Sequence, residues 1–61
     1  MTRDPRTDPQ PGDVLESGGI VREVTGVRDG RVQWAVGRIG YDAELTAWRI
    51  ANRKSLVIRA Y

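Results

Sequence analysis

The chain has 61 residues, enough for one small domain, and it contains neither cysteine nor histidine. This composition excludes disulfide cross-links and the usual structural zinc sites, and it removes the commonest catalytic base and the best nucleophile. The formal net charge of +2 is too small to indicate a partner by itself.

A domain of this size has little hydrophobic surface with which to stabilise itself. Such chains bury only about 60% of the surface that the unfolded chain exposes. A single core of this kind rarely supplies more than about 3–5 kcal/mol. Stability must therefore come from packing alone or from association, and a homodimer is one way to gain buried area.

The N-terminal segment is unlike the rest of the chain. Residues 1–11 contain all three prolines among alternating charges, and such a composition buries too little apolar surface to offset the entropy of ordering. We expect a disordered or extended tail over residues 1–11 and a single domain over residues 12–61. The segment lacks the apolar run of a signal peptide, and no run in the chain approaches the roughly 20 apolar residues that span a bilayer. We expect a soluble, cytoplasmic protein.

The domain begins with strand signals. Pro11-Gly12 predicts a turn, and residues 13–16 predict a short first strand. Over residues 20–38, β-branched and aromatic residues alternate with charged ones on both sides of Asp29-Gly30. This combination predicts a β-hairpin.

The register of this hairpin has two alternatives. A two-residue turn at Asp29-Gly30 sets Arg28 opposite Arg31, whereas a three-residue turn that includes Arg28 sets Val24 opposite Trp34. We favour the three-residue turn, because an aromatic residue pairs well with a β-branched one and facing like charges are unfavourable.

The C-terminal half predicts two further strands around a short helix. Residues 39–45 favour a fourth strand, and residues 45–54 favour a helix, since apolar residues recur there at every third position. Residues 55–61 alternate again and predict a fifth strand.

The start of the helix has two candidates. Thr46 is one candidate N-cap; alternatively, Asp42 caps a helix that starts at Ala43.

The two tryptophans predict the core. Trp34 and Trp48 supply much of the hydrophobic surface of so short a chain, so we expect both in the core, with Trp48 covering an open end of the sheet.

The predicted order of strand, hairpin, short strand, helical turn and strand resembles SH3-like barrels, including Tudor and KOW-type domains. The resembling residues are Gly12-Asp13-Val14, Gly19, Val24 and Val27. The resemblance implies an all-β, mainly β fold: a small five-stranded SH3-like barrel with one short helix before the last strand.

The chain also resembles small uncharacterised proteins encoded by phages and prophages. The matching segments are Pro11-Gly12-Asp13, Arg22-Glu23-Val24 and Leu45-Thr46-Ala47-Trp48-Arg49. Phage proteins of this size often bind and modulate a host protein, so the resemblance implies a protein partner.

The basic residues favour nucleic acid, DNA or RNA, as the first candidate partner. Residues 45–61 hold basic residues and no acidic one, and such a local excess favours an anionic ligand. Arginine forks contact phosphates, and an exposed aromatic ring can stack on a base. We expect the hairpin arginines to project from its solvent-facing side and its tip. The candidate contact residues are Arg22, Arg28, Arg31, Arg38, Tyr41, Arg49, Arg53 and Lys54.

A protein-interaction module is the alternative function, since SH3-like barrels commonly bind peptides or add a partner strand to an exposed edge. Asp42 and Glu44 are two residues apart and share a strand face, as an acid–base pair would, but such pairs more often protect a sheet edge. We expect a non-enzymatic module with no catalytic residues, cofactor or metal.

Overall fold

The computed structural model describes residues 3–60, which form one antiparallel sheet and one helix. The elements are β1 (Val14–Ser17), β2 (Ile20–Arg28), β3 (Arg31–Val36), β4 (Ile39–Glu44), α1 (Leu45–Asn52) and β5 (Leu56–Arg59). The strand order in the sheet is β4-β3-β2-β1-β5. The prediction of a mainly β chain with five strands and a short helix before the last strand is confirmed for these residues.

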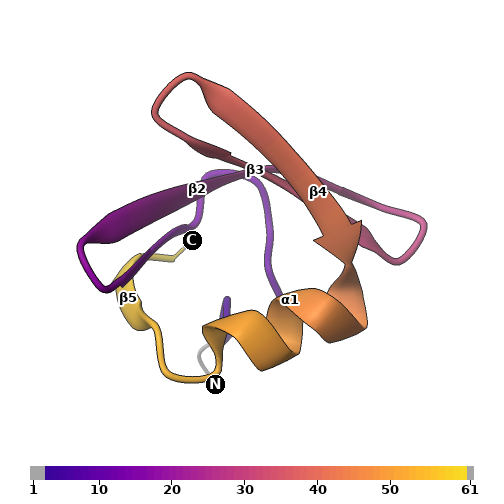
Figure 1. Cartoon of the computed structure of the whole chain (residues 1–61). Coiled ribbons are helices and arrows are strands. Elements are labelled where there is room, and N and C mark those ends of the chain that lie inside the picture. Colours follow the sequence, from indigo (N-terminus) through magenta and orange to yellow (C-terminus); the bar gives the residue numbers. More distant parts are fainter. Residues whose placement is uncertain (1–2, 61) are drawn as a thin grey trace.

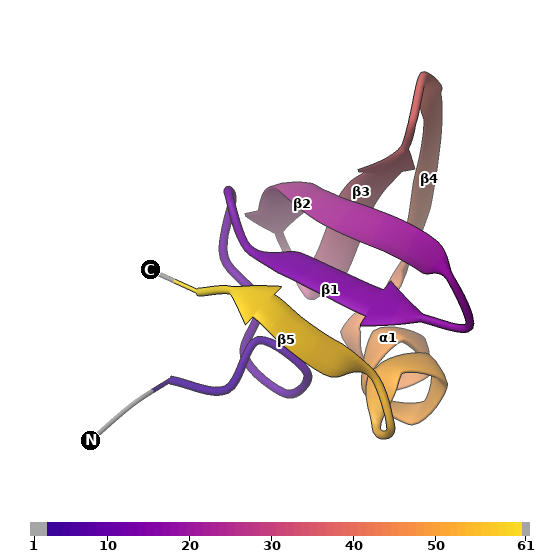
Figure 2. The same cartoon turned by 90° about the vertical axis from the view of Figure 1, so that its left-hand side faces the viewer.

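The sheet bends around an interior that α1 covers from the opposite side (Figures 1 and 2). Among the described strands, β4 and β5 each pair with a single neighbour, so the sheet remains open along both edges. The buried core consists of Leu15, Val24, Val32 and Trp48. Trp48 comes from α1 and is 1% exposed, which confirms its predicted place in the core. As the one helix of residues 3–60, α1 falls well short of the length that crosses a membrane.

The hairpin of β2 and β3 combines parts of both predicted registers. Asp29 and Gly30 have φ angles of 51° and 74°, and positive values at both central residues are those of a type I′ turn. Arg28 faces Arg31, so the turn has two residues and the favoured three-residue turn is wrong. A bulge directly after Val24 then shifts the register by one residue, and Val24 faces Trp34 after all.

The start of α1 differs from both predictions. The N-cap is Glu44, not Thr46 or Asp42, and its side chain makes no capping hydrogen bond within residues 3–60. The Leu45 amide, one of the first amides of the helix, instead donates to the Gly30 carbonyl at 2.8 Å. Because the hairpin turn satisfies this amide, the helix needs no side-chain cap there.

The N-terminal segment packs against the domain, where its composition predicted a disordered or extended tail; residues 1 and 2 of that tail lie outside the described residues. Pro5 and Pro9 are buried. The Trp48 indole Nε1 donates to the Pro5 carbonyl at 3.0 Å, and Arg49 Nε donates to the Thr7 carbonyl at 2.8 Å. Proline has little conformational freedom to lose, which lowers the entropy cost of ordering this segment.

Asp13 ties the same segment to the sheet. Its carboxylate is fully buried and accepts from both terminal nitrogens of Arg3, with Arg3 Nη2 lying 2.8 Å from Oδ1. The Gln10 amide donates to Oδ2 at 2.8 Å, and the Asp13 carbonyl accepts from the Val24 amide at 2.8 Å. A buried carboxylate is tolerated when it is paired and hydrogen-bonded in this way.

Candidate functional site

The arginines predicted to contact nucleic acid lie at different ends of the sheet and on the helix. Arg28 and Arg31 flank the turn between β2 and β3. Arg38 lies in the turn between β3 and β4, at the other end of β3. Arg53 and Lys54 follow α1. A single phosphate-binding surface would need these charges side by side.

Acidic neighbours also reduce the positive field around the hairpin tip. Arg31 Nη2 lies 3.2 Å from Asp42 Oδ1, and Arg28 Nε lies 3.7 Å from Asp29 Oδ2. These exposed ion pairs add little to stability, but each places a carboxylate where a phosphate would approach. Of the two acidic residues considered as an acid–base pair, Asp42 forms an ion pair with Arg31, and Glu44 is the N-cap residue of α1 without a side-chain capping hydrogen bond among residues 3–60.

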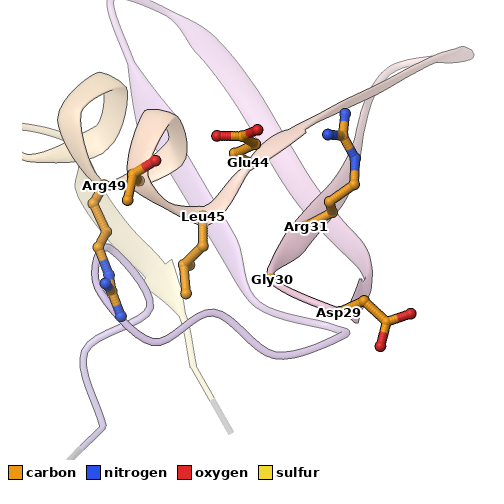
Figure 3. Close-up of a pocket in the computed structure, with 7 residues that line it drawn as sticks. Asp29, Gly30, Arg31, Glu44, Leu45 and Arg49 are labelled. Carbon is orange, nitrogen blue, oxygen red and sulfur yellow. The ribbon is translucent and has the colours of Figure 1, made fainter.

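A hollow of about 420 Å³ lies between the hairpin tip and the start of α1 (Figure 3). Its lining includes two acidic and two basic residues: Asp29, Glu44, Arg31 and Arg49. Figure 3 shows the Arg31 and Arg49 side chains pointing away from each other, and Arg49 donates to the Thr7 carbonyl. This hollow therefore does not concentrate positive charge.

A second hollow, of about 240 Å³, lies on the concave face of the sheet. We call it the inner groove; its lining residues are Ile20 and Arg22 from β2, Trp34 and Val36 from β3, and Tyr41 from β4. They share one face because residues two apart in a strand, and residues directly opposite each other, point to the same side. Val24 faces Trp34, and Trp34 faces Tyr41, in the register of the sheet.

Two stacked aromatic rings form the centre of the inner groove. The Trp34 and Tyr41 rings lie 5.8 Å apart between centroids with an interplanar angle of 18°. Trp34 also meets the buried Trp48 ring, at 5.1 Å and 58°. Trp34 is half-buried: it packs against the core but does not lie fully within it, where we expected it. Tyr41, on the other side of the stacked pair, is 47% exposed.

Arg22 is the charged residue of the inner groove. The sequence predicted it on the solvent-facing side of the hairpin, and this was wrong: it lies opposite the buried Leu15 and two residues before the buried Val24. Its Nη1 is buried and has no hydrogen-bond partner within residues 3–60. A buried donor of this kind is costly until it meets an acceptor.

The outer edge of the sheet at β5 is a second exposed apolar surface. Leu56, Val57 and Ile58 are 62%, 42% and 57% exposed. Such an edge can pair with another strand, and the homodimer predicted from chain length stays a prediction. Among residues 3–60, no cluster of histidine, cysteine or acidic side chains is arranged to hold a metal ion.

No protein-family model matches the sequence, and neither a curated protein nor a solved structure matches it. The function of this domain must therefore be inferred from its own structure.

Proposed function

We propose that the chain is a small non-enzymatic binding module, built as an SH3-like barrel, that binds a segment of another protein in the inner groove. The bent five-stranded sheet and the helix before β5 support the barrel. The binding of a host protein by a phage-derived module, which the sequence resemblance implies, is one form of this function.

The stacked pair of Trp34 and Tyr41 is the observation that carries the proposal. Trp34 is fixed against the core by Trp48, and Tyr41 lies half-exposed above it. Rigid aromatic side chains of this kind are enriched in the energetically dominant parts of protein interfaces. Because they are held in position before binding, little side-chain entropy is lost when a partner docks.

The size of the inner groove also favours a peptide. Sites for small molecules and cofactors usually enclose about 300–1,000 Å³, and the groove offers about 240 Å³. This volume suits one or two side chains of an extended segment.

Nucleic-acid binding is the second candidate, favoured by the residues that follow α1. Arg53 and Lys54 are exposed there, and the whole segment after Glu44 carries no acidic residue. A phosphate-contacting surface loses affinity steeply as salt rises. Two results would support this function: affinity for single-stranded DNA that falls as the salt concentration rises, and a lower affinity in the Arg53→Gln variant.

Selection from a display library of random nine-residue peptides tests the peptide-binding function. Selected peptides should bind the wild-type chain and lose most of their affinity for Tyr41→Ala. Ile50→Ala is the matched control, because Ile50 is an apolar side chain of α1 that is 70% exposed and lies outside the groove. Failure to select any peptide, or equal binding to the two variants, would contradict the proposal.

A further inference from the structure

We propose that Arg22 binds a carboxylate of the partner, so that the inner groove recognises an extended peptide with an acidic group next to an apolar side chain. The inference rests on the proposed function, because it names the chemistry of the segment that the groove binds.

The guanidinium of Arg22 supplies the first argument. Arg22 is the one charged residue among the described residues that line the groove, and its buried Nη1 has no hydrogen-bond partner within residues 3–60. Guanidinium groups donate in a planar fork that matches the two oxygens of a carboxylate. Arg22 as a whole is half-buried, so a ligand carboxylate in the groove can contact its guanidinium. A turn of this flexible side chain would then bring Nη1 to an acceptor that the described residues do not provide.

The other side chains of the groove supply the second argument. Ile20 and Tyr41 are each 47% exposed although both belong to the concave face, and Val36 lies beside them. These side chains and Trp34 offer apolar contact around a single cation. The complementary ligand carries one negative charge and an adjacent apolar group.

The lining of the groove favours a carboxylate over a nucleic-acid phosphate. Arg22 is the one cation among the described residues that line it, and the other side chains are apolar or aromatic. A nucleic acid carries a phosphate at every nucleotide, so a phosphate next to the one at Arg22 would face apolar side chains. A peptide with one acidic residue brings a single charge and avoids this mismatch.

Nuclear magnetic resonance titration of the whole chain with four probes tests the inference. The probes are 4-phenylbutyrate, its neutral analogue 4-phenylbutyramide, adenosine monophosphate and adenosine. The indole signal of Trp34 and the amides of Ile20 and Val36 report on the groove, while the amides of Thr7 and Arg49 report on a site outside it. We expect 4-phenylbutyrate to shift the groove signals in a saturable way and to bind about tenfold or more tightly than the amide, as a charge-assisted hydrogen bond predicts.

Arg22→Gln should remove this preference for the acid, and Arg22→Lys should keep part of it because the charge remains. Arg38→Gln, an exposed arginine in a turn outside the groove, is the matched control and should leave the preference unchanged. Equal affinity for acid and amide, no saturable shift with either, or tighter binding of adenosine monophosphate than of 4-phenylbutyrate would overturn the inference. If the acid and the amide bind equally while Tyr41→Ala still weakens the binding of selected peptides, only the role of Arg22 is overturned. If no peptide can be selected, the proposed function itself is contradicted.

Discussion

The Trp48 indole and the Pro5 carbonyl are joined by a hydrogen bond of 3.0 Å across 43 positions of the chain. Both residues are buried. The next residue of α1, Arg49, donates to the Thr7 carbonyl, so two successive helix residues hold the N-terminal segment by its backbone. In a chain with so few buried side chains, this segment is part of the core.

Removal of residues 1–10 should therefore strongly destabilise the domain. The truncation uncovers Trp48 and removes Arg3 from the buried carboxylate of Asp13. Aromatic side chains bury about 150–250 Å² each, and partial exposure at about 25 cal/mol per Å² costs about 2–3 kcal/mol. Urea unfolding followed by tryptophan fluorescence measures the loss. Equal stability of the full and truncated chains would show that the segment does not pack on α1.

Trp48→Phe isolates the hydrogen bond more closely, since it removes the Nε1 donor and keeps an aromatic ring. The buried Pro5 carbonyl loses its partner, and we expect a loss of about 1–3 kcal/mol in the free energy of unfolding. The control Ile50→Ala, at an exposed position of the same helix, should change it by no more than about 0.5 kcal/mol. A similar small change in both variants would argue against the bond.

Asp13→Asn tests the buried carboxylate that accepts hydrogen bonds from Arg3 and Gln10 of the N-terminal segment. The substitution removes the charge that Arg3 meets, and we expect a loss of about 1.5–3 kcal/mol in the free energy of unfolding. Because the two residues interact directly, the effects of Asp13→Asn and Arg3→Gln should not add in the double variant. Additive losses would contradict a direct pair.

The pair of Asp4 and Arg6 predicts a pH dependence confined to acid. Arg6 Nε and Nη2 each donate to the Asp4 carboxylate at 3.0 Å, and these side-chain hydrogen bonds lower the pKa of Asp4 below its ordinary value. Because the folded-state pKa is the lower one, the pair stabilises the fold above the unfolded-state pKa of about 3.9, and this contribution is lost as pH falls through the folded-state pKa.

The contribution is small because both side chains are more than a third exposed. Titration of the Asp4 carboxyl carbon by NMR should show the lowered pKa, and Arg6→Gln should raise it again. An Asp4 pKa that Arg6→Gln leaves unchanged would contradict the pair.

Local patterns predicted the strands and the hairpin well, and the register less well. Asp29-Gly30 identified the turn because positive φ at both positions depends on these two residues alone. The bulge after Val24 depends on packing across the sheet, since it restores the contact of Val24 with Trp34. Gly26 was the available signal: glycine within a strand often marks a bulge.

Composition failed at the N-terminal segment because it counts apolar side chains and ignores backbone acceptors. The carbonyls of Pro5 and Thr7 serve as partners for Trp48 and Arg49, and no pattern in residues 1–11 reveals this.

The site was predicted only in part. Of the predicted contact residues, Arg22 and Tyr41 lie together in the inner groove, whereas the others lie elsewhere on the chain. The alternation that starts at Val24 would have placed Arg22 on the concave face, because residues two apart share a side. Ile20 was missed, because its exposure depends on whether other side chains fill the groove, and the sequence pattern does not show this.

Intermolecular nuclear Overhauser effects between the phenyl ring of 4-phenylbutyrate and methyl groups of the chain test the inner groove most directly. Binding in the groove predicts contacts with the methyl groups of Ile20 and Val36 and none with Leu56 or Ile58 on the exposed β5 edge. Contacts with the β5 methyl groups in place of the groove, or spread equally over both surfaces, would contradict the groove as the binding site.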